Sequence, residues 1–186
     1  MNGGPSKQAM IDDIATRDAM MALRAKIRGL DTAMLTAMDR RYMPSSRPMI
    51  SLLLDDDGVV WFFAASDGGL AERIDINPRV SITYSDAARG VYVSLSGYAR
   101  LMFDPDRIFA LWDSRLATWF PQGPTDARLA LLRVEIDHAE YWDAGSSKMV
   151  QLFALARAAL TGQVAHAGGE HRRLAVRPSR VERQST

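Results

Sequence analysis

Short apolar runs separated by turn-forming residues fill the middle of the chain, and this pattern constrains the fold more than any other feature. The runs do not alternate regularly with helical segments, which disfavours a doubly wound parallel sheet. Two of them flank Asp55-Asp56-Asp57-Gly58, a sequence typical of a β-hairpin turn. An antiparallel barrel with helical flanks fits best, because closure leaves no exposed sheet edge. We expect about six strands, over residues 33–38, 49–54, 59–65, 80–84, 91–103 and 129–136, the last extended by 140–142.

Helical patterns surround these runs, so the expected class is mainly β with flanking helices (α+β). Residues 10–28 carry apolar side chains at three- and four-residue steps, with acids early and bases late as the helix dipole favours. Short helices are expected over residues 70–76 and after the N-cap sequence Asp104-Pro105. Gly97 predicts a bulge or bend in a long strand. A further amphipathic helix over 146–161 completes a single domain of residues 10–162, between a disordered tail at 1–9 and a basic, disordered tail at 163–186.

Composition excludes several classes of function. None of the 186 residues is a cysteine, which excludes disulfides, cysteine-ligated zinc, iron–sulfur clusters and a cysteine nucleophile. A net charge of +1 gives no general attraction to nucleic acid or to an anionic membrane. No segment approaches the ~18 consecutive apolar residues of a membrane span, and the first ten residues lack the apolar core of a secretory signal. We therefore expect a cytoplasmic protein that binds neither nucleic acid nor membrane.

Standard catalytic and metal-binding motifs are missing from the sequence. It contains no G-x-S-x-G, no G-x-G-x-x-G, no phosphate loop ending in Gly-Lys-Ser/Thr and no H-E-x-x-H. The cluster Asp55-Asp56-Asp57-Gly58 suggests a calcium loop only weakly, because the twelfth position would be Ser66 and not a glutamate. His138 stands alone at a strand end and receives no role. No metal ligand and no catalytic residue is predicted.

Three local clusters remain as candidate binding elements. Ser45-Ser46-Arg47-Pro48-Met49 places an arginine at a strand entrance, where it can clamp a phosphate or carboxylate or simply lie on the surface before a proline turn. The segment from Trp61 to Gly69 runs from an aromatic strand into small residues and a helix start. Its peptide N–H groups can bind an anion, unless Asp67 caps the helix.

The third cluster is Trp119-Phe120-Pro121-Gln122-Gly123, within a loop expected over residues 114–126. Its aromatics either contact a ligand or partner chain, or cover the core of their own domain. Together, the clusters suit a planar, phosphorylated ligand. None supplies a general acid or base, so a cofactor would have to bring the redox chemistry.

The sequence resembles the general stress protein branch of the pyridoxamine 5′-phosphate oxidase-like family of flavin-binding split barrels. The resemblance spans roughly residues 11–162 and consists of short pieces in family order. They are Met34-Leu35-Thr36, Ser46-Arg47-Pro48-Met49, Val60-Trp61-Phe62-Phe63, Asn77-Pro78-Arg79-Val80, Tyr92-Val93-Ser94-Leu95-Ser96-Gly97, Leu111-Trp112, Trp119-Phe120-Pro121-Gln122-Gly123 and Glu140-Tyr141-Trp142-Asp143.

This resemblance implies a six-stranded antiparallel split β-barrel that forms a homodimer with two interfacial FMN sites. On one protomer it implies a flavin lined by the strand-entrance cluster and a ribityl phosphate flanked by the end of the aromatic strand. The Trp119-Phe120 loop and Tyr141-Trp142 would approach from the other protomer. The implied cofactor-binding residues are Arg47, Pro48, Met49, Phe62, Phe63, Ala64, Ala65, Ser66, Gly69, Leu70, Trp119 and Phe120.

One departure from the family concerns the phosphate. Relatives commonly carry a lysine shortly after the aromatic strand and a threonine after the Phe-Phe pair, whereas this chain has Ser66-Asp67-Gly68-Gly69-Leu70 and Ala64. Ser66, the amides of Gly68 and Gly69, Arg47 or Arg73 are the candidate replacements. The resemblance implies a flavin-dependent oxidoreductase that acts on a small molecule with an electron donor such as reduced nicotinamide. The alternative is a stress protein that binds or sequesters flavin without turnover.

Overall fold

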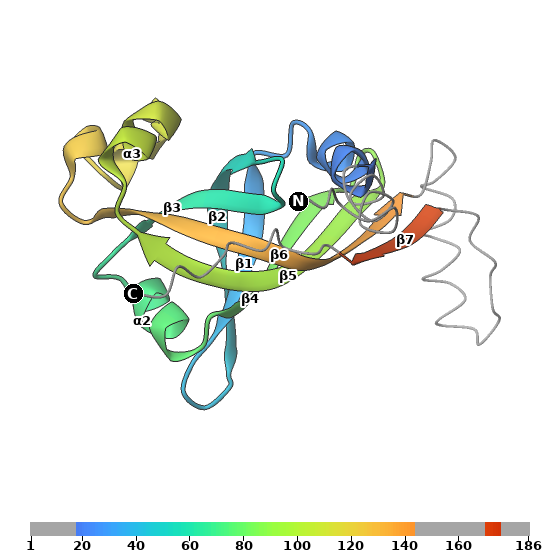
Figure 1. Ribbon diagram of the computed structural model, residues 1–186, viewed down its shortest axis with the longest axis horizontal. Coiled ribbons are helices and arrows are strands. Elements are labelled where there is room, and N and C mark those ends of the chain that lie inside the picture. The colour runs from blue at the N-terminus through green and yellow to red at the C-terminus, as the bar shows by residue number, and fades with distance from the viewer. Residues whose placement is uncertain (1–17, 144–169, 176–186) are drawn as a thin grey trace, which may run out of the picture.

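The computed structural model describes residues 18–143 and 170–175. Residues 18–27 are helical, and Gly29 ends this helix with a φ of 78°, which a glycine adopts without steric cost. The other elements appear in Figure 1. In chain order they are β1 (Thr32–Met38), β2 (Pro44–Leu54), β3 (Val59–Ala65), α2 (Gly69–Ile76), β4 (Arg79–Asp86), β5 (Val91–Met102), α3 (Pro105–Leu111), the 3₁₀ turns η1 (Ser114–Thr118) and η2 (Gly123–Thr125), β6 (Leu129–Asp143) and β7 (Glu170–Ala175).

The strands form one antiparallel sheet in the order β3-β2-β1-β4-β5-β6-β7, and β3 also pairs with β6. That additional pairing closes β1 to β6 into a six-stranded barrel, which confirms the fold expected from the sequence. The Asp55–Gly58 segment makes the predicted hairpin turn between β2 and β3, with Gly58 at a φ of 77°. Asp104 caps α3 by accepting a hydrogen bond from the Arg107 N–H, also as predicted.

Two helices close opposite ends of the barrel. The helix at residues 18–27 lies at the end of β2, where the Arg24 Nε donates to the Leu54 carbonyl at 3.1 Å. Helix α2 lies at the start of β2, where the Arg73 guanidinium donates to the Met43 carbonyl at 3.4 Å. Both helices contribute side chains to the core inside the barrel. These are Met20, Leu23, Leu70 and Ile74.

The long strand β6 carries a β-bulge at its middle. Ser96 of β5 lies opposite His138. Its neighbour Gly97 lies opposite Ile136, so Asp137 is the extra residue. After the bulge, odd-numbered instead of even-numbered residues of β6 face the core, so both halves of the strand bury apolar side chains. The two predicted pieces, 129–136 and 140–142, are therefore one continuous strand. The irregularity lies at Gly97, as predicted, but the extra residue belongs to β6 and not to the strand that carries this glycine.

Strand β7 corrects the expectation of a disordered tail over residues 163–186. Residues 170–175 pair with residues 138–143 of β6, so the sheet extends beyond residue 162, where the sequence placed the domain boundary. The segment Glu-His-Arg-Arg-Leu-Ala has no alternating apolar pattern, and its backbone pairing with β6 decides its conformation. The predicted tail at 1–9, the first part of the predicted helix at 10–28, and the helix at 146–161 lie outside the described residues. Within the described residues, none of the helices is long and apolar enough to cross a membrane.

Candidate functional site

Strand β2 changes partner halfway along its length. Residues Pro44–Ile50 pair with β1, whereas the pairing with β3 involves only Ser51, Leu53 and Leu54. At the far end of β3, residues 63–65 pair with β6 alone. Two strand edges therefore face each other without ladder hydrogen bonds, and we call this region, between residues 44–50 of β2 and 63–65 of β3, the β2–β3 seam. The split expected of the barrel lies here.

The Arg47 side chain lies at this seam. It stands opposite Leu35 of β1, whose side chain is fully buried, so Arg47 belongs to the inward face of its strand. Met49, two residues on, packs against the core. The half-buried Arg47 guanidinium forms no hydrogen bond or ion pair with any residue the structure describes. A guanidinium keeps its charge and has five N–H donors, so it can bind an anion here.

The start of α2 offers a second set of donors. Gly68 is the N-cap residue and no side chain caps the helix, so the alternative in which Asp67 caps it is wrong. The first intrahelical hydrogen bond runs from the Glu72 N–H to the Gly68 carbonyl at 3.3 Å, and the N–H groups of residues 69–71 precede it. Apart from its chain neighbours and its own helix backbone, no atom of a described residue lies within 4 Å of the position that a Cβ on Gly69 would occupy. The helix start is therefore open, as close approach of a phosphate requires.

Arg73, one of the candidate replacements for the family lysine, is engaged elsewhere. Besides its bond to Met43, its guanidinium lies 3.9 Å from the Asp39 carboxylate in the β1–β2 turn. Backbone N–H groups of Met43 and Arg41, with a smaller contribution from Arg73, hold the pKa of Asp39 below its usual value. Arg73 thus fastens α2 to the turn, and Arg47 is left as the seam arginine that has no partner among the described residues.

The turn between β3 and α2 is tied to the start of β6. The Ser66 N–H donates to the Arg128 carbonyl at 2.8 Å, and Ser66 itself is an exposed residue. The Arg128 side chain binds the buried Asp126 carboxylate in a two-pronged ion pair, with Nη2 at 3.0 Å from Oδ2. This pair lowers the pKa of Asp126 and raises that of Arg128, to which Asp67 also contributes.

The predicted cofactor-binding side chains of the aromatic strand, β3, lie on two opposite faces of that strand. Phe62 and Ala64 point into the barrel core. Phe63 faces the other way, where its ring centroid lies 6.0 Å from that of Trp112, and Ala65 packs on the same outer cluster. Because the phenylalanines are buried by their own domain, this strand can meet a ligand only through its backbone and its end. Pro48, Ser66 and Gly69 are exposed, Met49 is half-buried and Leu70 is buried.

The two aromatics of the 114–126 loop have different surroundings. Phe120 is 6% exposed and belongs to a core cluster with Trp61, Phe63 and Leu131. For Phe120, the alternative of a cluster covering its own domain is therefore correct. Trp119 is 60% exposed and remains available for a ligand or partner chain. The loop itself holds the turns η1 and η2, which the sequence did not predict.

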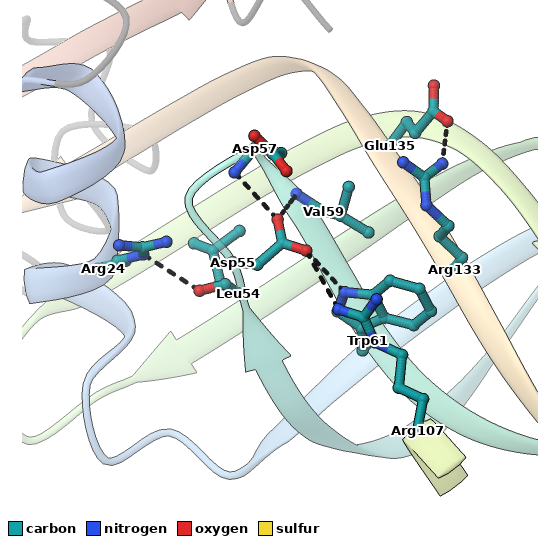
Figure 2. Close-up of polar contacts among 9 residues, drawn as sticks. All are labelled: Arg24, Leu54, Asp55, Asp57, Val59, Trp61, Arg107, Arg133 and Glu135. Atoms are coloured by element: carbon teal, nitrogen blue, oxygen red, sulfur yellow. Dashed lines mark hydrogen bonds and ion pairs between the residues drawn. The ribbon is translucent and has the colours of Figure 1, made fainter. Parts of the chain in front are cut away.

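The Asp55 carboxylate organises the β2–β3 turn, as Figure 2 shows. It accepts hydrogen bonds from the N–H groups of Asp57 and Val59 and, at 2.9 Å, from the Trp61 indole. Its oxygens are thus occupied by the turn itself, in agreement with a turn in place of a calcium loop. In the part of the chain that the structure describes, no group of three or more His, Cys, Asp or Glu side chains could hold a metal ion.

Sequence reasoning identified Arg47 and the glycines of the α2 start from their chemistry. It did not identify the change of partner in β2, which leaves these donors beside unpaired strand edges. The change arises from pairing between residues far apart in the chain, and a single sequence contains no local signal for it.

A model of the family described as pyridoxamine 5′-phosphate oxidase-like matches residues 18–166 of this chain. The chain is 32% identical to a general stress FMN/FAD binding protein from Xanthomonas citri, over 72% of this chain and 92% of that one, with a TM-score of 0.57. General Stress Protein 26 from Bacillus anthracis is 20% identical over 69% of this chain and 95% of its own, with a TM-score of 0.61. Protein bli-3 from Neurospora crassa is 22% identical over 87% of this chain and 82% of its own length.

Proposed function

The chain belongs to the pyridoxamine 5′-phosphate oxidase-like family, and on that premise we propose that it binds FMN at the β2–β3 seam. The observation that carries the proposal is the Arg47 guanidinium, which has no partner in residues 18–143 and 170–175, on a barrel that also has an open helix start at Gly69. A phosphate group needs several N–H donors and a positive charge, and both are present without the family lysine. The similarity to a protein described as FMN/FAD binding supports the same cofactor class.

We expect different residues to contact the phosphate and the ring of FMN. Arg47 and the N–H groups at the start of α2 would hold the phosphate, with the hydroxyl of the exposed residue Ser66 as a further donor. Pro48 and Met49 offer apolar surface beside Arg47 for the ring. When bound, FMN supplies hydride or electron transfer, and the protein positions it and sets its electrostatic surroundings.

We propose a homodimer as the functional unit. The outward face of β1, β2 and β4 carries exposed methionines and small hydroxyl side chains, and no described helix covers it. Such a face suits close packing of a second copy, whose exposed Trp119 would then be free to approach the seam. Analytical ultracentrifugation tests the dimer, and the exchange Met34→Arg should shift it towards monomer, because Met34 lies centrally on this face.

The proposed activity is reduction of a small substrate with electrons from reduced nicotinamide or reduced flavin. The second candidate, flavin binding without turnover, is favoured by the side chains at the seam, since Arg47 and Ser66 offer no general acid or base near neutral pH. Assays with reduced nicotinamide and a panel of acceptors separate the two, because turnover no faster than that of free flavin indicates binding alone. The cytoplasmic location stays a prediction.

The test of FMN binding is the visible spectrum of the purified protein, followed by titration with FMN. Absorbance near ~450 nm, a general property of oxidised flavins, supports the proposal, and a colourless protein that takes up no added FMN contradicts it. Arg47→Ala should weaken FMN binding by ~1.5–3 kcal/mol, as expected for loss of hydrogen bonds to a charged group. Arg47→Lys should restore part of the affinity, and Arg28→Ala, at an exposed arginine outside the seam, should leave it unchanged.

A further inference from the structure

Three outward-facing residues form a row across β5, β6 and β3. Arg100 lies directly opposite Arg133, and Arg133 lies directly opposite Trp61. Neighbouring strands are about 4.8 Å apart, so these side chains stand side by side on one face of the barrel. Arg107 of α3 joins the row, with its Cζ atom 3.8 Å from the centre of the Trp61 ring (Figure 2). The guanidinium groups of Arg107 and Arg133 thus both lie near the Trp61 indole, and Arg100 stands on the other side of Arg133.

The carboxylates near this row are already engaged. Glu135 pairs with Arg133, the least exposed of the three arginines. Asp55 accepts hydrogen bonds from the turn and from Trp61, and it reaches Arg107 only at 3.8 Å. The guanidinium groups of Arg100 and Arg107 donate no hydrogen bond to any residue in the described ranges 18–143 and 170–175. Arg100 is exposed and Arg107 is half-buried, so N–H donors of both side chains remain available to a ligand.

The arrangement carries an electrostatic cost that an anion would remove. Like charges directly opposite each other on neighbouring strands repel and destabilise a sheet. Burial, and after it the charge of Arg100, lower the pKa of Arg133 below its usual value. Arg107 also lowers it, whereas the carboxylates of Asp55 and Asp57 act in the opposite direction.

We propose that Arg100 and Arg107 bind a phosphate group above Arg133, either as inorganic phosphate or as part of a small phosphorylated molecule. Arginine matches this ligand, because its planar fork donates two parallel hydrogen bonds to phosphate oxygens. The site is distinct from the seam, since Arg47 belongs to the inward face of β2. It does not depend on whether the chain binds flavin.

The test is isothermal titration of the full-length protein with inorganic phosphate and, separately, with ribose 5-phosphate. Arg100→Gln and Arg107→Gln should each weaken binding about tenfold or more, because each removes charged hydrogen bonds to the anion. Arg28→Gln is the matched control, an exposed arginine outside the row whose charge loss is the same. Arg47→Gln removes the arginine contact at the seam, so the phosphate binding that this variant retains belongs to the row on β5 and β6. Tighter binding of the ester than of inorganic phosphate would identify a phosphorylated metabolite as the ligand, and equal binding would indicate the free anion.

The proposal is wrong if phosphate fails to bind to the wild-type protein at millimolar concentration. It is equally wrong if Arg28→Gln weakens binding as much as Arg100→Gln does, since that result indicates a general charge effect. Loss of binding in Arg47→Gln alone would assign the phosphate to the seam and also overturn the proposal. Circular dichroism of each variant shows that the barrel is intact, and Arg100→Lys, which keeps the charge without the fork, should bind with intermediate affinity.

Discussion

Replacing Gly97 with alanine tests how closely β5 and β6 approach at the bulge. A Cβ atom on Gly97 would lie 2.0 Å from the Glu135 carbonyl oxygen and 2.8 Å from its carbon, whereas ordinary contact begins at 3.4 Å. Both atoms are backbone and cannot rotate away. The two strands would have to separate locally by more than ~1 Å, which strains the core and stretches neighbouring ladder hydrogen bonds.

We expect Gly97→Ala to lower the free energy of unfolding by ~3–5 kcal/mol, from ~1–3 kcal/mol of overpacking and about two weakened hydrogen bonds. This is a large part of the ~5–15 kcal/mol that stabilises a typical domain. Urea unfolding at a fixed protein concentration, followed by tryptophan fluorescence, should show a midpoint more than ~1 M lower.

Gly69→Ala is the matched control, because its added Cβ meets no atom of another described segment within 4 Å and alanine favours the helix that starts there. Its stability should stay within ~1 kcal/mol of the wild type. Equal midpoints for the two variants would refute the reasoning, since they would show that the β6 backbone is not in contact with Gly97.

Three further predictions concern stability and ionisation. Phe120→Ala should cost ~3–5 kcal/mol in urea unfolding, as for buried phenylalanines generally, whereas Trp119→Ala should stay within ~0.5 kcal/mol because that side chain is exposed; similar losses would contradict the assignment of Phe120 to the core. Burial raises the pKa of Tyr84 to about 12, so its phenol stabilises the fold below pH ~10 and this contribution disappears as pH rises through 12; ultraviolet titration should show a tyrosine ionising at about pH 12, and Tyr84→Phe should remove that step. The hydrogen bonds from Arg128 lower the pKa of Asp126, so its ion pair stabilises the fold above pH ~4 and is lost on further acidification; Asp126→Asn should reduce the melting temperature at pH 7 and flatten its dependence on pH below 5, and an unchanged acid profile would count against the pair.

The barrel could be predicted from the sequence because its turns and helix caps are local. Asp55–Gly58 and Asp104-Pro105 determine a hairpin and a helix start through contacts within a few residues, and both are confirmed. Strand β2 begins five residues before its predicted start at Met49, because the pairing of Pro44–Pro48 with β1 overrides a sequence rich in proline and serine. Strand β7 was missed for the same reason, since its partner lies elsewhere in the chain.

The candidate site was predictable in its chemistry and not in its geometry. An arginine at a strand entrance and glycines before a helix indicate anion binding from residue type alone. That Arg73 is bound to a turn while Arg47 has no partner among the described residues depends on the packing of α2 against β1 and β2. The burial of Phe62 and Phe63 on opposite faces of β3 likewise follows from the second layer that α3 and its loop add outside the barrel.

In β2, the residues that close the barrel and the residues that offer binding groups lie in different halves of one strand. Its second half pairs with β3 and closes the barrel, whereas its first half pairs with β1 and leaves its other edge unpaired with β3. Substitutions along this edge can therefore change ligand specificity without disturbing the packing of the core. A fold whose binding residues do not also stabilise the barrel can evolve specificity for new small molecules more readily than a fold whose binding residues do.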